Sequence, residues 1–99
     1  MSSNLKDDEV NSRLAELTDW VYQNGKISRE FLFADFVGAF SFMTSVALLA
    51  EKYNHHPEWS NVYARVQVDL TTHDSSGVTE KDLILAHDME RIYFRLVRD

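Results

Sequence analysis

Three stretches of the chain carry apolar side chains at helical spacing, and each predicts a helix. The first covers residues 7–19 and begins with acidic residues suited to an N-cap. The second covers roughly residues 35–53, with Asp35 as its N-cap. The third follows residues 79–82, Thr-Glu-Lys-Asp, which resemble a capping box with aspartate in place of the usual glutamate.

Between these helices, two regions have the pattern of β-structure. Residues 20–23 and 26–33 are rich in β-branched and aromatic side chains and flank Asn24-Gly25, a dipeptide typical of a tight hairpin turn. Residues 62–70 alternate apolar and polar side chains, as a half-buried strand does. The alternation allows one strand, or two strands joined by a turn near Ala64-Arg65.

The order of these elements predicts the fold class. Helix, two strands, helix, one or two strands and helix give an α+β domain with antiparallel strands and helices on one face of the sheet. A chain of 99 residues has room for a single hydrophobic core, so residues 1–99 are expected to form one domain.

Two apolar stripes run along the second predicted helix, where a helix on a domain surface normally carries one. One stripe consists of Phe36, Phe40, Met43, Ala47 and Ala50, and the other of Phe42, Val46, Leu49 and Tyr53. The extra stripe either contacts a second subunit or meets the other helices of the same chain, and the sequence favours neither interpretation.

Composition and charge exclude several classes of function. The absence of cysteine excludes disulfides, thiolate metal sites and a cysteine nucleophile. The net charge of −6 disfavours direct binding to nucleic acid. The polar, acidic start lacks the pattern of a signal peptide, and the uncharged run over residues 36–50 is too short to span a membrane. We therefore expect a cytoplasmic protein, also nuclear in a eukaryotic source, that does not bind a membrane.

Three of the four histidines lie at the ends of predicted elements. His55 and His56 leave the second helix just before the only proline, and His73 ends the second β-region. Rigid elements often present reactive side chains at such ends, although a solvated helix terminus and a turn explain these histidines equally well. Glu51 lies four residues before His55, a spacing that would let its carboxylate fix the imidazole tautomer.

Other chemistries fit the sequence poorly. Adjacent histidines diverge on an extended backbone, and no His-Glu-x-x-His motif is present, so no metal site is expected. The nucleophile elbow of serine hydrolases, the phosphate loop and the dinucleotide fingerprint are also absent. Metal-free acid–base catalysis by histidine remains, and dehydration is one reaction that needs both a proton donor and a proton acceptor.

Several motifs point to a known family. They are Ala50-Glu-Lys-Tyr-Asn-His-His-Pro-Glu-Trp59, Asn61-Val-Tyr63, Val68-Asp-Leu-Thr-Thr-His-Asp74, Gly77 and Thr79-Glu-Lys-Asp82, with Phe40-Ser-Phe-Met-Thr-Ser-Val-Ala47 and Trp20 upstream. With these residues the chain resembles the pterin-4a-carbinolamine dehydratase family, also known as the dimerisation cofactor of a hepatocyte homeodomain transcription factor. The resemblance runs from about Trp20 to the third helix.

The resemblance implies a fold and an activity. The fold would have a four-stranded antiparallel sheet with three helices on one face, in the order α-β-β-α-β-β-α. The enzyme would convert 4a-hydroxytetrahydrobiopterin to quinonoid dihydrobiopterin and water, without a cofactor, and so support tetrahydrobiopterin recycling. Asp74 stands where animal members tend to carry glutamate, which shortens the reach of that carboxylate.

The resemblance also implies site residues and partners. The catalytic residues would be His55, His56 and His73, with His55 and His73 protonating the departing hydroxyl and His56 taking a proton from a pterin nitrogen. The substrate-binding residues would be Glu51, which orients His55, Asp82, which orients His73 or contacts the pterin, Trp20, which walls the pocket, and Asn54. Family members form homodimers and homotetramers, which the apolar side chains of the second helix around Phe42, Val46 and Leu49 would explain. A non-catalytic role as a dimerisation or coactivator scaffold, bound to a helix of a partner protein, is the alternative function.

Overall fold

The computed structural model describes residues 4–97 as one α+β domain, and it confirms the predicted fold class and element order. The helices are α1 (Asp7–Arg13), α2 (Phe36–Tyr53) and α3 (Glu80–Val97), and the strands are β1 (Val21–Gln23), β2 (Lys26–Leu32), β3 (Glu58–Val62) and β4 (Arg65–Leu70). Two short 3-10 helices, η1 (Leu14–Glu16) and η2 (His73–Ser75), follow α1 and β4.

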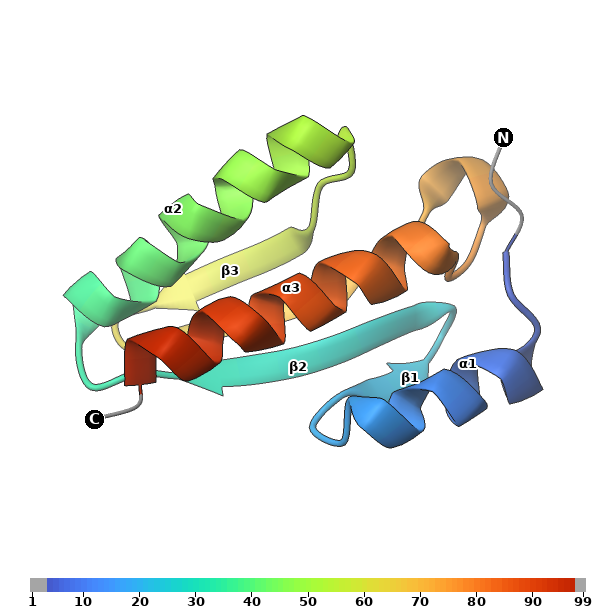
Figure 1. The fold of residues 1–99 in the computed structure, drawn as a ribbon, viewed down its shortest axis with the longest axis horizontal. Coiled ribbons are helices and arrows are strands. Elements are labelled where there is room, and N and C mark those ends of the chain that lie inside the picture. The colour runs from blue at the N-terminus through green and yellow to red at the C-terminus, as the bar shows by residue number, and fades with distance from the viewer. Residues whose placement is uncertain (1–3, 98–99) are drawn as a thin grey trace.

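The four strands form one antiparallel sheet in the order β1-β2-β4-β3, and α2 and α3 lie across one face of it (Figure 1). The second β-region is therefore two strands, as the family resemblance implied. They are joined at Tyr63-Ala64, where Tyr63 has a φ of 50°. Strand β3 begins at Glu58, four residues before the alternating pattern starts, because Trp59 and Asn61 supply its half-buried positions.

The first helix is shorter than the predicted range of 7–19. The α-helix ends at Arg13 and continues as the 3-10 turn η1. The N–H groups of Leu17 and Trp20 then donate to carbonyls three residues earlier, each at 3.0 Å. This tighter path carries the buried side chains of Leu17 and Trp20 into the core just before β1 begins.

Helix α2 starts at the predicted N-cap, where the Asp35 carboxylate accepts a hydrogen bond from the N–H of Gly38 (2.8 Å). The core-facing side chains are Ala39, Phe42, Val46 and Ala50, while Phe36, Val37, Phe40 and Leu48 are exposed. The Phe42 ring packs on Phe31 with a centroid separation of 4.6 Å. The prediction that Phe42 and Val46 contact a second subunit is therefore wrong, because both lie in the core of their own chain.

One end of the sheet gathers the ends of several elements. The C-terminus of α2, the start of β3, the 3-10 turn η2 and the N-terminus of α3 lie near one another in Figure 1. All three candidate histidines belong to these segments. Within residues 4–97, no helix is both long and apolar enough to cross a membrane.

Candidate active site

The exit from α2 sets the position of His55. Asn54 adopts the left-handed conformation (φ 52°) and ends the helix, and the N–H of His55 donates to the Ala50 carbonyl (3.0 Å). This is the six-to-one hydrogen bond of a Schellman motif. The left-handed position of that motif is usually glycine and sometimes asparagine. The chain leaves the helical path at this point, so His55 turns inward and is only 8% exposed.

His55 is held by a buried carboxylate on the first turn of α3. Its Nε2 lies 2.5 Å from Oδ1 of Asp82, whose side chain is fully buried. The other oxygen, Oδ2, accepts hydrogen bonds from the hydroxyl of Thr72 (2.8 Å) and from the N–H of Thr79 (2.9 Å). An ionised carboxylate only accepts hydrogen bonds, so Nε2 of His55 carries the proton.

The Thr79–Asp82 bond is the predicted capping interaction, with the shorter aspartate reaching the N-cap backbone. Asp82 thus caps α3 and also binds His55. Of its two predicted roles, orienting His73 is corrected, because both of its oxygens are occupied by His55, Thr72 and Thr79. Contact with the pterin stays a prediction.

His56 lies on the outer side of the same turn. Its Nε2 is 2.6 Å from Oε1 of Glu51, and both side chains are more than half exposed. The prediction that Glu51 orients His55 is therefore wrong. The four-residue spacing holds only inside a helix, and the left-handed turn at Asn54 exchanges the two histidines with respect to Glu51.

His73 begins η2 and is 77% exposed, yet it too meets a carboxylate. Its Nε2 lies 2.8 Å from Oε2 of Glu58 on β3, and Oε1 of Glu58 accepts a hydrogen bond from Nζ of Lys26 (2.6 Å). That hydrogen bond from Lys26, with the positive charges of Lys26 and His73, holds the pKa of Glu58 below its ordinary value. The same bond raises the pKa of Lys26, and Asp69 adds to the effect.

The three histidines line one cleft of about 250 Å³. Its lining residues are Asn54, His55, His56, Thr71, Thr72, His73, Asp74 and Lys81. In each of the three imidazoles, Nε2 contacts a carboxylate oxygen. A neutral imidazole that donates its proton from Nε2 to a carboxylate has a free lone pair on Nδ1. The cleft therefore combines three imidazoles, each of which is paired with a carboxylate.

Of the two remaining predicted site residues, Asn54 lies at the cleft and Trp20 lies in the core. Asn54 lines the cleft and also ends α2. Trp20 is not among the cleft-lining residues. It is 4% exposed, donates from its indole N–H to Glu90 (2.8 Å) and packs edge-on against Phe31.

Sequence reasoning assigned no role to Glu58, Lys81, Thr71 or Thr72. Glu58 stands inside the quoted His-His-Pro-Glu-Trp motif, and Lys81 inside the capping motif. For Glu58, its place in the motif was the signal that the sequence offered, because its contacts with Lys26 and His73 depend on the pairing of β3 with β4. Across residues 4–97, no group of three or more histidine, aspartate or glutamate side chains is arranged to hold a metal ion.

Known proteins similar to this chain cover most of its length. Residues 3–92 match the family model described as pterin 4 alpha carbinolamine dehydratase. A protein of Solibacter usitatus (strain Ellin6076), named "Putative pterin-4-alpha-carbinolamine dehydratase", is 51% identical over 92 residues, which are 93% of this chain and 97% of that protein. A protein of Rhizobium johnstonii with the same name is 55% identical over 84 residues, 83% of each chain.

Two solved structures are similar in fold. A crystal structure from Brucella melitensis, described as a transcriptional coactivator/pterin dehydratase, has a TM-score of 0.88 at 46% identity and covers 92% of this chain and 99% of that one. A pterin dehydratase-like protein, described as a RuBisCO assembly factor in the alpha-carboxysome, has a TM-score of 0.63 at 16% identity, with 75% and 86% covered, and shares the fold alone. From the family match and these identities, the chain belongs to the pterin 4 alpha carbinolamine dehydratase family.

Proposed function

We propose that this protein is a hydro-lyase that dehydrates 4a-hydroxytetrahydrobiopterin to quinonoid dihydrobiopterin and so supports tetrahydrobiopterin recycling. The observation that carries the proposal is the cleft in which His55, His56 and His73 each pair Nε2 with a carboxylate. Membership of the dehydratase family supports it. The acceptor role of each carboxylate prepares an imidazole for proton transfer, because it fixes the tautomer and stabilises the imidazolium.

The reaction needs one proton to arrive and one to leave. The C4a–O bond breaks with its electrons going to oxygen, and a proton from an imidazolium converts the departing hydroxide to water. A second imidazole takes the proton from a pterin nitrogen, and that N–H electron pair forms the new C=N bond. We assign protonation of the hydroxyl to His55 and His73 and removal of the nitrogen proton to His56.

The surroundings of His55 and His56 suit their assigned tasks. Asp82 is fully buried and makes three hydrogen bonds, so His55 has a fixed position in the cleft wall. His56 and Glu51 are both exposed, so a proton taken by His56 passes readily to solvent. Each general acid or base of this kind contributes about 10²–10⁴-fold to the rate.

The test is a dehydration assay in the presence of chelator. A pterin-dependent hydroxylase generates the carbinolamine in situ, and its decay is followed by ultraviolet absorbance. We expect wild-type protein to accelerate the decay, and His56→Ala and His73→Ala to lose at least about 100-fold. His87→Ala is the matched control, since His87 lies in mid-α3 near Glu16 and outside the cleft. Full activity of both cleft variants would refute the assignment of these residues.

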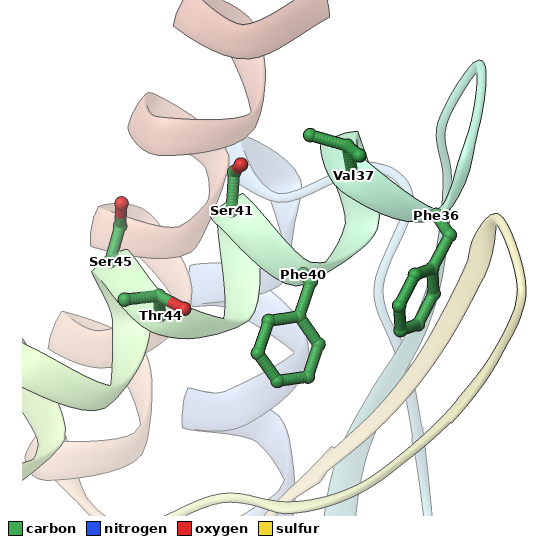
Figure 2. A pocket seen from close by; sticks show the side chains of 6 residues that line it. All are labelled: Phe36, Val37, Phe40, Ser41, Thr44 and Ser45. Carbon is green, nitrogen blue, oxygen red and sulfur yellow. The ribbon is translucent and has the colours of Figure 1, made fainter.

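The outward face of α2 supports a second part of the proposal, self-association. Phe36, Val37, Phe40 and Leu48 are 47%, 72%, 53% and 71% exposed, and an apolar hollow of about 510 Å³ lies along Phe36, Val37, Phe40, Ser41, Thr44 and Ser45. Figure 2 shows the rings of Phe36 and Phe40 projecting from the same side of the helix. Their centroids are 5.5 Å apart. A large exposed apolar patch is typical of an interface. We propose that this face forms the homodimer or homotetramer contact.

The same face is the candidate site for a coactivator role. The Brucella melitensis structure is described as a transcriptional coactivator as well as a dehydratase, which favours keeping this alternative. A partner helix with an apolar stripe would fit the exposed face of α2. Phe40→Asp, analysed by sedimentation, is expected to give monomers and to abolish partner binding. An unchanged oligomer would exclude this face as the contact.

A further inference from the structure

Lys26 and Glu58, to which no catalytic role is assigned, form a chain of contacts that ends at His73. Glu58 uses both carboxylate oxygens, Oε1 toward Nζ of Lys26 (2.6 Å) and Oε2 toward Nε2 of His73 (2.8 Å). The three residues belong to β2, β3 and η2, and 32 positions separate Lys26 from Glu58. Only the tertiary fold brings them together.

The sheet register explains why Lys26 reaches Glu58. Strand β4 lies between β2 and β3, and Glu58 pairs with Asp69. The neighbours of Asp69 on β4, Val68 and Leu70, are buried under the helices, so Asp69 and Glu58 lie on the opposite face. Lys26 precedes the buried Ile27 and shares that face, so its side chain bridges across the end of β4.

The orientation of His73 depends strongly on its contact with Glu58, more than the orientation of the buried His55 depends on Asp82. Its side chain is 77% exposed and stands on a three-residue turn, so little packing restrains its rotation. Glu58 is therefore the contact that selects one orientation. Lys26 restrains Glu58 in turn, because its amino group lies 2.6 Å from Oε1 and holds that oxygen by a charge-assisted hydrogen bond.

We propose that Glu58 is a positioning residue for the dehydration, which holds His73 in a single orientation with its proton on Nε2, and that Lys26 anchors Glu58. The inference rests on the proposed function for its kinetic consequence. In the neutral ring Nδ1 keeps the lone pair, so His73 exchanges its proton with substrate through Nδ1. The hydrogen bond from Lys26 also lowers the pKa of the Glu58 carboxyl.

Other charged groups share this corner of the molecule. Asp74 and Lys81 line the cleft with His73, and Asp69 lies beside Lys26 and Glu58 on the sheet. None of them has a recorded contact with the His73 ring in the described part of the chain, so we assign the orienting role to Glu58 alone.

The first test reads the orientation directly and needs no activity. In labelled protein, the three-bond couplings from the backbone to the His73 ring carbon report the χ1 rotamer. We expect one rotamer in the wild type and averaging among rotamers in Glu58→Ala. We expect partial averaging in Lys26→Met and a single rotamer again in Lys26→Arg, which keeps the positive charge. Glu30→Gln is the matched control, because Glu30 pairs with Arg65 (3.4 Å) on the same face of the sheet without contacting a histidine. Unchanged couplings in Glu58→Ala would overturn the proposal.

The second test measures the kinetic consequence. A misplaced catalytic group costs about 10- to 100-fold, so Glu58→Ala is expected to lower kcat by that factor with KM little changed. In the His73→Ala background the same change is expected to have no further effect, because the group that it positions is gone. If the two substitutions lowered kcat independently, so that their losses multiplied, Glu58 would not act through His73. An inactive wild type would refute the proposed function, while the NMR couplings of His73 would still decide whether Glu58 orients it.

Discussion

Replacing Asp82 with alanine tests the reasoning about the buried cluster most directly. Asp82 is fully buried and accepts from His55, Thr72 and Thr79. Truncation leaves the Thr79 N–H and Nε2 of His55 without this acceptor, while the Thr72 hydroxyl keeps its contact with the Thr79 hydroxyl (2.8 Å). Each unsatisfied buried donor costs about 1–3 kcal/mol. The neighbouring cleft lets water reach part of the space, so we expect a loss of about 3 kcal/mol. Domains of this size are stable by only about 5–15 kcal/mol, so this is a large fraction of the whole.

The conservative variant separates charge from shape. In Asp82→Asn the amide oxygen can still accept from Thr72 and Thr79, while its NH₂ group faces Nε2 of His55 and forces the proton onto Nδ1. We expect a stability loss of about 1 kcal/mol, because one charge-assisted bond is exchanged for a neutral one. The dehydration rate is expected to fall strongly although the free energy of unfolding changes little, because the tautomer of His55 is reversed.

The assay is urea unfolding followed by tryptophan fluorescence. With an m value of about 1–3 kcal/mol per molar urea, a loss of 3 kcal/mol lowers the midpoint by about 1–3 M. Asp88→Ala is the control, because Asp88 is also a buried aspartate on α3 but contacts Tyr53 and Arg91 outside the cleft. It is expected to cost about 1 kcal/mol and to leave dehydration intact. An unfolding free energy of Asp82→Ala within about 0.5 kcal/mol of the wild-type value would refute this role of the Asp82 carboxylate.

Three further predictions concern the turn, the core and pH. Gly25→Ala is expected to cost about 1–2 kcal/mol in urea unfolding, because Gly25 has a φ of 74° while an added Cβ would meet no atom within 4 Å; an unchanged midpoint would contradict the strain argument. Phe42→Ala is expected to cost about 3–5 kcal/mol and Phe40→Ala less than about 0.5 kcal/mol in the monomer, since Phe42 is fully buried and Phe40 is 53% exposed; equal losses would disprove the assignment of the two faces. The pKa of Glu58 is lowered and that of Lys26 raised, so the stability from Glu58 is lost as pH falls through its lowered pKa, and that from Lys26 as pH rises through its raised pKa. The difference in unfolding free energy between wild type and Lys26→Met should therefore be greatest between these limits and small at high salt, and a difference independent of pH would be inconsistent with the ion pair.

The sequence by itself predicted the long helices and the first hairpin, and it singled out the histidines of the cleft. Local signals sufficed where the physics is local: the side chain of Asp35 caps its own helix, Asn24-Gly25 turns its own hairpin, and Asp82 bonds to Thr79 three residues away. His55, His56 and His73 could be singled out because they stand at element ends within a recognisable motif.

The tertiary structure alone decided which carboxylate meets which imidazole. A left-handed residue at Asn54 breaks the helical spacing, which gives Glu51 to His56 and turns His55 toward Asp82. Glu58 reaches His73 only because β3 pairs with β4 in one register. Which apolar stripe of α2 is buried was likewise undetermined by periodicity, because both stripes are apolar and only packing against the sheet and α3 distinguishes them. Contacts between residues distant in sequence depend on the whole fold, and so no local pattern records them.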